Sequence, residues 1–273
     1  MSYIMSQTAY MNPVSFQCHT TVAEFLLGDI NSKPEKIWIL HVGESSGHDG
    51  QLCTQAMVDV VRHFQRLALE HGKEVTGLIH KSDNCQEQFK SRHTVASWFT
   101  ASALLSSPFD SEDHRINYNS GFPITKVWGT AGHGKAECDA VGGIGFKCLL
   151  LDAVKRKKLQ ITDPKTCVDY VVKLKSKVKK KFWLIDSDRY QELKALKNTP
   201  APAIKGIQDY QLCLIDVKNV DKKWEDCRFS FSNLLTDDRS KWSSKSINLG
   251  TDFSKVDRFV YDEETYDNFD NIK

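Results

Sequence analysis

The stretch from Val75 to Arg92 most constrains what this chain can fold into, because it carries the signals of a strand, a turn and a helix in direct succession. The apolar run that ends at Lys81 is typical of a strand buried on both faces. The polar cluster Ser82-Asp83-Asn84 comes next and is typical of a helix N-cap. Asp83 is therefore expected at the carboxyl end of an inner strand, the edge where ligands gather in open α/β sheets. Two roles stay open for Asp83, a helix cap or part of a functional site.

The charge of the chain is unevenly distributed, although its formal net charge is only +2. A basic middle extends from Lys155 to Lys181, and the stretch from Thr251 onward is mainly acidic. A basic surface near a candidate carboxylate favours a polyanionic partner such as DNA, and the alternative is an ordinary solvated surface. The side chains that we predict to contact nucleic acid are Lys90, Arg92, Lys155, Arg156, Lys157, Lys158, Lys179, Lys180 and Lys181.

The composition is that of a globular protein, with 40% hydrophobic and 26% charged residues. The 8 cysteines form no C-x-x-C pair, which favours free thiols in a reducing compartment over a disulfide framework. The first residues lack the pattern of a signal peptide, and no apolar run reaches membrane-spanning length. We therefore expect a soluble intracellular protein, nuclear or cytoplasmic, without a membrane partner.

Alternation and helical periodicity predict an ordered series of elements along the chain, beginning with a hairpin. The predicted strands are 14–22, 36–42, 75–81, 122–128, 180–185, 211–217 and 227–231, and the predicted helices are 50–69, 83–103, 137–157 and one that starts at 162. Asp49 is expected to cap the first helix, and Pro164 fits the first turn of the last. This order fits a mixed sheet in which parallel strands meet an antiparallel edge.

The domain organisation follows from a change in character after residue 175. We predict an α/β domain at 1–175, a small α+β region at 176–250 and a loose acidic tail at 251–273. Within the 137–157 helix, Gly142, Gly143 and Gly145 would each lower helix stability by about 1 kcal/mol relative to alanine. Their spacing predicts that another backbone or a ligand approaches the helix closely there.

Two short blocks give the chain a resemblance to a known family. The first is Ser82-Asp-Asn-Cys85 with Gln88-Phe-Lys90, and the second is Gly132-His-Gly-Lys135 with Cys138-Asp-Ala-Val-Gly-Gly143. Together they resemble the catalytic domains of transposon-encoded proteins, the DDE/D-type transposases, over roughly residues 7 to 220. The resemblance implies a ribonuclease H-like fold, in which a mixed sheet is flanked by helices.

If the resemblance holds, it implies a two-metal site that cuts or joins DNA with Mg²⁺ or Mn²⁺. Asp83 matches the second acid of such a site, and Asp139 is the candidate for the third, with Glu137 in reserve. His133 and Lys135 would approach the scissile phosphate.

The chain departs from the family pattern in two respects. No Asp or Glu precedes Ala23, so the first acid and the central strand that carries it are not found. We therefore expect a DNA-binding protein that is catalytically incomplete, and the alternative is an active metal-dependent nuclease or transposase. Cys227 stands alone in the region where the family tends to have a zinc-binding tail, so no structural zinc is expected.

A rival hypothesis comes from Gly129 to Lys135, which follows a strand and satisfies most of a phosphate-binding loop. Ala136 stands where the loop needs a hydroxyl to ligate magnesium. The apolar run Leu149-Leu-Leu that ends in Asp152 lies inside the helix that would follow the loop, so it cannot be a separate acidic strand. Nucleotide binding thus remains the third hypothesis.

Overall fold

The chain forms two compact units, each assembled from separate stretches of sequence. Unit 1 comprises Met1–His48, Lys135–Glu192 and Asp262–Lys273, and unit 2 comprises Asp49–Gly134 and Leu193–Tyr261. The predicted boundary near residue 175 does not coincide with this division. Two strands that follow this position, at residues 180–185 and 212–217, pair with strands that precede it, and they do so in different units. The computed structural model describes residues 2–3, 14–25, 33–44, 50–83, 85, 89–106, 121–129, 137–157, 160–172, 180–185, 204–217, 227–232, 240 and 243–247.

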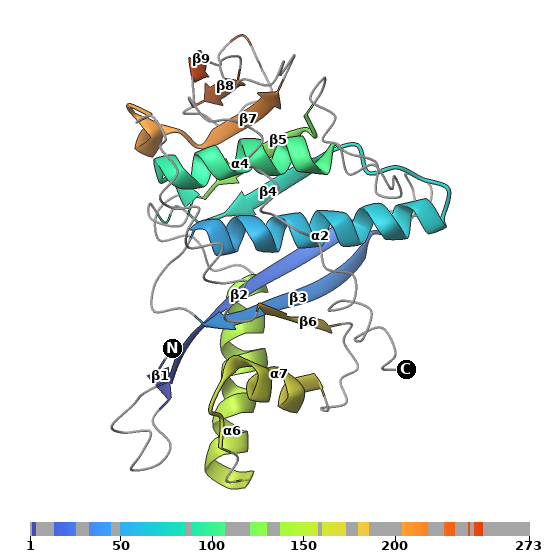
Figure 1. Cartoon of the computed structure of the whole chain (residues 1–273), viewed down its shortest axis with the longest axis vertical. Coiled ribbons are helices and arrows are strands. Elements are labelled where there is room, and N and C mark those ends of the chain that lie inside the picture. The colour runs from blue at the N-terminus through green and yellow to red at the C-terminus, as the bar shows by residue number, and fades with distance from the viewer. Residues whose placement is uncertain are drawn as a thin grey trace. The chain divides into compact units, whose positions relative to one another are not determined.

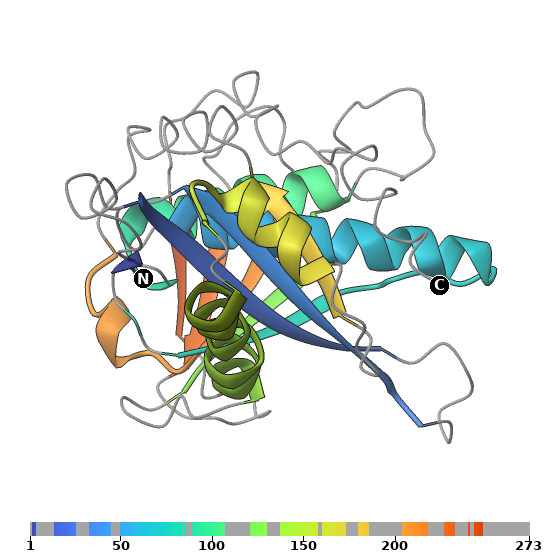
Figure 2. The same ribbon diagram turned by 90° about the horizontal axis from the view of Figure 1, so that it is seen from below.

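Unit 1 is built on a sheet in the order β1-β2-β3-β6 (Figures 1 and 2). Its strands are β1 (Ser2–Tyr3), β2 (Val14–Phe25), β3 (Glu35–Glu44) and β6 (Lys180–Ile185). The predicted hairpin is confirmed, since β2 and β3 are antiparallel and place Val22 opposite Trp38. β6 adds to the other edge of β3 in the parallel direction, with Leu40 opposite Phe182.

Helical segments of unit 1 pack against this sheet, and they include an eight-residue π-helical segment where the glycines cluster; the helix that follows it packs against the last helix of the unit instead. The order is α5 (Glu137–Asp139), the π-helical η1 (Ala140–Lys147), α6 (Cys148–Lys157) and α7 (Pro164–Val172). A Cβ on Gly142 would lie 2.8 Å from Thr20 Oγ1 of β2. A close approach is therefore found at Gly142, but it is made by the Thr20 side chain of β2 and not by the backbone or ligand that the glycines predicted.

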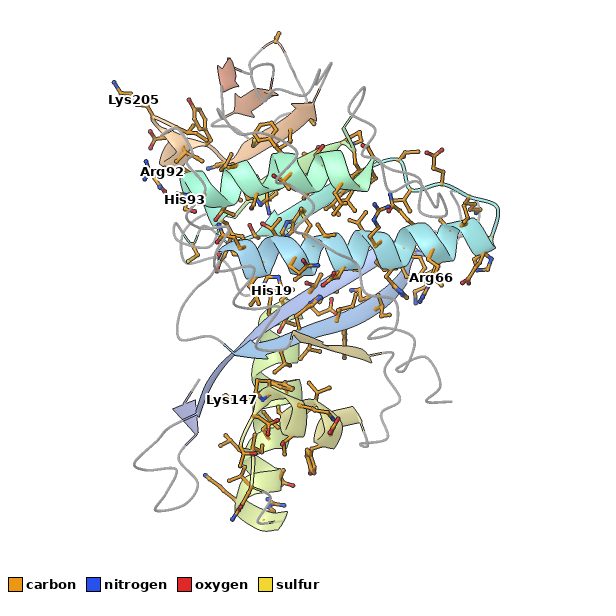
Figure 3. All side chains as sticks on the ribbon, viewed as in Figure 1. His19, Arg66, Arg92, His93, Lys147 and Lys205 are labelled. Atoms are coloured by element: carbon orange, nitrogen blue, oxygen red, sulfur yellow. The ribbon has the colours of Figure 1, made fainter. Side chains whose placement is uncertain are left out.

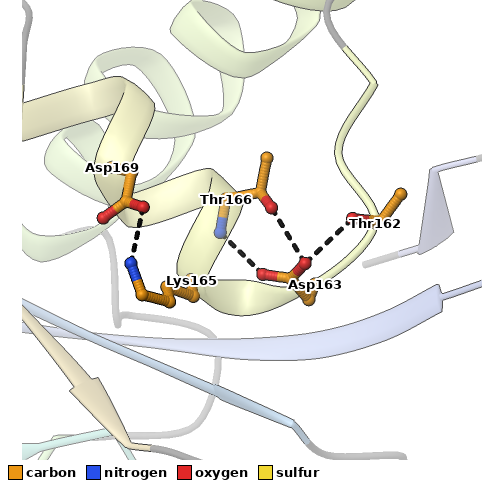
Figure 4. Close-up of polar contacts among 5 residues, drawn as sticks. All are labelled: Thr162, Asp163, Lys165, Thr166 and Asp169. Carbon is orange, nitrogen blue, oxygen red and sulfur yellow. Dashed lines mark hydrogen bonds and ion pairs between the residues drawn. The ribbon is translucent and has the colours of Figure 1, made fainter.

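The start of α7 follows the predicted rule for Pro at the first helical position (Figure 4). Asp163 Oδ1 accepts a hydrogen bond from the Thr166 backbone N–H at 2.7 Å, and Oδ2 accepts one from each of the Thr166 and Thr162 hydroxyls. Asp163 is therefore the N-cap. One turn on, Lys165 and Asp169 form an exposed ion pair.

Unit 2 is built on a second sheet, in the order β4-β5-β7-β8-β9 (Figure 1). Its strands are β4 (Leu78–Ser82), β5 (Ile124–Trp128), β7 (Leu212–Val217), β8 (Cys227–Ser232) and β9 (Ser243–Ile247). β4 and β5 are parallel, and every other neighbouring pair is antiparallel.

β4 differs from the inner, doubly buried strand that its apolar residues predict. It lies at the edge of the described sheet, and its residues alternate between half-buried and exposed. Ile79 is 77% exposed, while β5 beside it buries Ile124, Lys126 and Trp128. β5 is the inner strand because it pairs with β7 as well as β4.

The helices of unit 2 are α2 (Gly50–Glu70), α4 (Arg92–Leu105) and the short 3₁₀ turn η2 (Ile207–Asp209). α4 packs against β7, and α2 packs against α4. The N-cap of α4 is Ser91, whose Oγ accepts a hydrogen bond from the Thr94 backbone N–H at 3.1 Å. Asp83 does not cap α4, since its Oδ1 accepts from the Cys85 backbone N–H instead.

The fold is therefore mixed α/β, as the sequence predicted. The hairpin and the β4–β5 pair, which were expected to share one sheet, belong to two sheets, because β6 occupies the free edge of β3. None of the described helices combines the length and the apolar character that a bilayer crossing requires.

Candidate functional site

The candidate site of unit 2 is the edge at which the parallel strands β4 and β5 both end. Their register places Ser82 opposite Trp128, and the Gly129 backbone N–H donates to Ser82 O at 2.9 Å. The two carboxyl ends are thus joined directly. Asp83 follows β4 at this edge with an exposed side chain, as the sequence predicted for the end of a strand.

Lys90, predicted as a contact to nucleic acid, has a different position. Its side chain is 2% exposed, and its Nζ donates to Gln208 O at 2.9 Å and to Tyr210 O at 2.8 Å. The ammonium also lies 4.8 Å from the centre of the Trp128 ring. Burial lowers the pKa of Lys90, and the negative charge of Asp209 opposes that effect. Lys90 therefore connects the residues before α4 to the turn at η2 through buried hydrogen bonds, and its ammonium is not accessible to a phosphate.

Three cationic or titratable side chains lie at the same end of α4 (Figure 3). Arg92 is exposed in the first turn of the helix, and its Nε lies 3.3 Å from His93 Nε2. Lys205 is exposed on the turn that leads into η2, the turn that Lys90 fastens to the start of α4. We call Arg92, His93 and Lys205 the basic rim. Of these, only Arg92 was predicted; Lys205 has no signal in the sequence beyond a lysine next to Gly206.

The second sequence block continues into unit 1. Asp139 and Glu137 belong to α5, so the candidates Asp83 and Asp139 lie in different units. Glu137 Oε1 accepts from Trp38 Nε1 at 2.9 Å, and Oε2 accepts from Lys36 Nζ at 2.6 Å. The hydrogen bond from Lys36 is the main reason that the pKa of Glu137 lies below its usual value. Glu137 thus ties α5 to β3, with both carboxylate oxygens engaged.

Part of the predicted basic middle lies in unit 1. Lys155 and Arg156 are exposed on α6, and Arg156 Nε pairs with Asp152 Oδ1 at 2.8 Å, one helical turn away. Lys157 is the last residue of α6, and Lys180 and Lys181 begin β6. Predicted positions that fall outside the described residues are Asp49, His133, Lys135, Lys158, Lys179 and the acidic tail.

A two-metal site needs several carboxylates around ions about 4 Å apart. Within the described residues, no group of three His, Cys, Asp or Glu side chains is placed to hold a metal ion. At the edge of β4 and β5 the described candidate carboxylate is Asp83, with one oxygen already accepting from Cys85. The described residues therefore do not fit a two-metal centre.

Two polar side chains that contact each other went unrecognised in the sequence, the half-buried His80 on β4 and the buried Lys126 on β5. Lys126 is fully buried, and its Nζ contacts His80 Nδ1. The signal that could have found Lys126 is its place between Ile124 and Trp128, since residues two apart in a strand share a face. An ionisable residue that lies on the same face of a strand as two large apolar residues is expected to be buried with them.

One comparison with known proteins gives a match. A family model described as a domain of unknown function (DUF8701) matches residues 5–220. No curated protein and no solved structure matches the chain. Because the family model spans well over half of the sequence, the chain belongs to this family.

Proposed function

We propose that the protein binds nucleic acid at the carboxyl edge of β4 and β5, and that it descends from transposases with a ribonuclease H-like fold. The observation that carries this proposal is the parallel, in-register pairing of β4 with β5. In such a pair both strands end at the same edge, which is where ligands bind in open α/β sheets.

The chemistry of the basic rim supports a phosphate ligand. The guanidinium of Arg92 and the ammonium of Lys205 are exposed, and Arg92 belongs to the first turn of a 14-residue helix. Phosphate oxygens are attracted both to such cations and to the positive end of a helix dipole. Lys90 keeps the two segments that carry the rim together through its bonds to Gln208 and Tyr210. The rim is thus held in place before any ligand arrives.

The proposal is limited to binding, because the described residues do not assemble a two-metal centre. Asp83 has one carboxylate oxygen without a described hydrogen bond, so its proposed role is to hold a single Mg²⁺ or Mn²⁺ weakly beside a phosphate. DNA cleavage is not part of the proposal.

The test is a salt titration of binding to a fluorescein-labelled DNA duplex, followed by fluorescence anisotropy. Each neutralised phosphate contributes about −0.9 to the slope of log affinity against log salt concentration. The double variant Arg92→Gln/Lys205→Gln should therefore flatten the slope by about 2. In MnCl₂, the wild-type protein should bind slightly more tightly than in its absence, and Asp83→Asn should lose that increment.

The matched control removes two positive charges from unit 1, at exposed lysines that are not among the predicted contacts to nucleic acid. Lys147→Gln/Lys165→Gln leaves the basic rim intact. Its slope should stay close to that of the wild type. A flattening confined to the control variant, an equal flattening in both variants, or wild-type protein that does not bind the duplex would refute binding at the rim.

A further inference from the structure

A row of three polar side chains crosses the sheet of unit 2. The register places His80 of β4 opposite Lys126 of β5, and Lys126 opposite Cys213 of β7. Directly opposed residues share a face of a sheet, so all three point to the same side. That side is covered by α4, because Trp98 of α4 lies 4.6 Å from Lys126 Nζ.

The surroundings of the Lys126 ammonium are almost wholly apolar. Its Nζ contacts His80 Nδ1 and lies 5.3 Å from the centre of the Phe89 ring, in addition to Trp98. Among the described residues no carboxylate contacts it. Burial lowers the pKa of Lys126 to about 7, and the thiols of Cys53 and Cys213 oppose this effect.

The neighbouring groups do not supply a negative charge near neutral pH. Burial raises the pKa of the Cys213 thiol, with Lys126 opposing, so Cys213 stays neutral. Cys53 of α2 is also buried. A second buried ammonium lies near these rings. Lys90 Nζ is 4.8 Å from the centre of the Trp128 ring, and the centre of that ring is 5.8 Å from the centre of the Trp98 ring.

The contact between Lys126 Nζ and His80 Nδ1 favours one bound proton on these two atoms and disfavours two. With one proton the ammonium donates to the neutral imidazole Nδ1, and the two ring faces stabilise the cation. With two protons an imidazolium and an ammonium would touch, and two like charges repel strongly where the local dielectric is low. The two groups therefore titrate as a coupled pair.

We propose that the half-buried His80 and the buried Lys126 form a shared proton site that makes the pairing of β4 with β5 respond to pH near neutrality. An exposed lysine cannot do this, because it stays charged until about pH 10.4. In the closed pair Lys126 binds its proton less readily than in an opened one. Opening is therefore linked to proton uptake, and β4–β5 pairing weakens as the pH falls. This response to pH does not require bound nucleic acid.

The first experiment titrates the lysines of the full chain by NMR, after uniform labelling of lysine with ¹³C and ¹⁵N. One lysine signal should titrate with a midpoint near pH 7, and it should be missing in Lys126→Met. His80→Phe, which removes the imidazole and keeps a ring, should move that midpoint by more than about half a pH unit, or about 0.7 kcal/mol. The proposal fails if no lysine titrates between pH 6 and 8, or if His80→Phe leaves the midpoint unchanged.

The second experiment measures hydrogen exchange in peptides that cover β4 and β5 at pH 6 and pH 8, corrected for intrinsic exchange rates. A lysine with a pKa of about 7 when closed and 10.5 when open makes opening about tenfold more favourable at pH 6 than at pH 8. Lys126→Met should lose this difference. The control Lys81→Met, at an exposed position of β4, should keep it. Equal protection of the wild type at both pH values, or a difference between pH 6 and pH 8 that persists in Lys126→Met, would overturn the proposal.

Discussion

Lys90→Met tests whether a buried ammonium holds the basic rim together. Methionine keeps the unbranched, flexible stem and removes the charge, so packing against Trp128 is largely kept. The variant loses two hydrogen bonds, to Gln208 O and Tyr210 O, and the cation–π contact with Trp128. It also escapes the cost of burying a charge, which is the effect that lowers the pKa of Lys90.

The balance favours the lysine by a modest amount. Hydrogen bonds to a charged group contribute about 1.5–3 kcal/mol each, and a partly desolvated cation–π contact adds about 1 kcal/mol. Together they amount to roughly 4–7 kcal/mol, against an ammonium desolvation cost of several kcal/mol. Water reaches the two carbonyls in part once the ammonium is gone, since Gln208 is exposed and Tyr210 half-buried. We expect Lys90→Met to lower the free energy of unfolding of unit 2 by about 2 kcal/mol.

Two measurements on the full chain check this value. Urea denaturation followed by tryptophan fluorescence gives the change in stability, and hydrogen exchange gives the opening of residues 204–211. A change of 2 kcal/mol corresponds to about a thirtyfold loss of protection in that segment. Lys81→Met on the exposed face of β4 is the matched control and should change stability by less than about 0.5 kcal/mol. A Lys90→Met protein as stable as the wild type, with residues 204–211 equally protected, would show that desolvation cancels the hydrogen bonds.

Two further predictions concern unit 1. Gly142→Ala should lower the free energy of unfolding by about 1–3 kcal/mol in urea denaturation, because the added Cβ would lie 2.8 Å from Thr20 Oγ1. Thr20→Ala should restore most of that loss, and a Gly142→Ala protein that is as stable as the wild type would contradict the close approach. Asp163→Ala should cost about 1 kcal/mol at pH 7. Burial alone would raise the pKa of Asp163, but the hydrogen bonds from Thr166 and Thr162 hold it below the usual value of 3.8. The contribution is therefore complete above pH 3.8 and is lost as the pH falls through the folded-state pKa. Asp163→Asn, which keeps one acceptor oxygen but no charge, should lose part of the contribution at pH 7, and an equal cost of Asp163→Ala at pH 2 and pH 7 would contradict the charge-dependent cap.

Local patterns predicted the elements of the fold well. The alternation in β2 and β3 identified the hairpin, and the Asp163-Pro164 pair located the start of α7. These signals are short-range, because a cap or a strand face depends on residues only a few positions apart. β9 was missed, since Ser243–Ile247 has three serines and a lysine and only one large apolar residue.

The same local patterns misjudged residues whose roles depend on distant partners. Lys90 was predicted to contact nucleic acid, yet its Nζ donates to two carbonyls that lie 118 and 120 positions away in the chain. His80 and Lys126 form a contact across two strands that no local pattern joins. For Lys90 and Lys126, the apolar neighbours in the sequence gave the only clue that the charge would be buried.

Strand pairing explains why the predicted single sheet became two. β2 pairs with one edge of β3 and leaves the backbone N–H and C=O groups of the other edge available for a second strand, which can be parallel or antiparallel. β6, whose Lys180-Lys181-Phe182-Trp183-Leu184-Ile185 run was assigned to the other side of the predicted boundary, meets that need in the parallel direction. β7 in turn occupies the second edge of β5, which makes β5 rather than β4 the buried strand. The edge that carries Asp83 is therefore set by pairings made far along the chain, while the residues that could bind a ligand there are recognisable from the sequence itself.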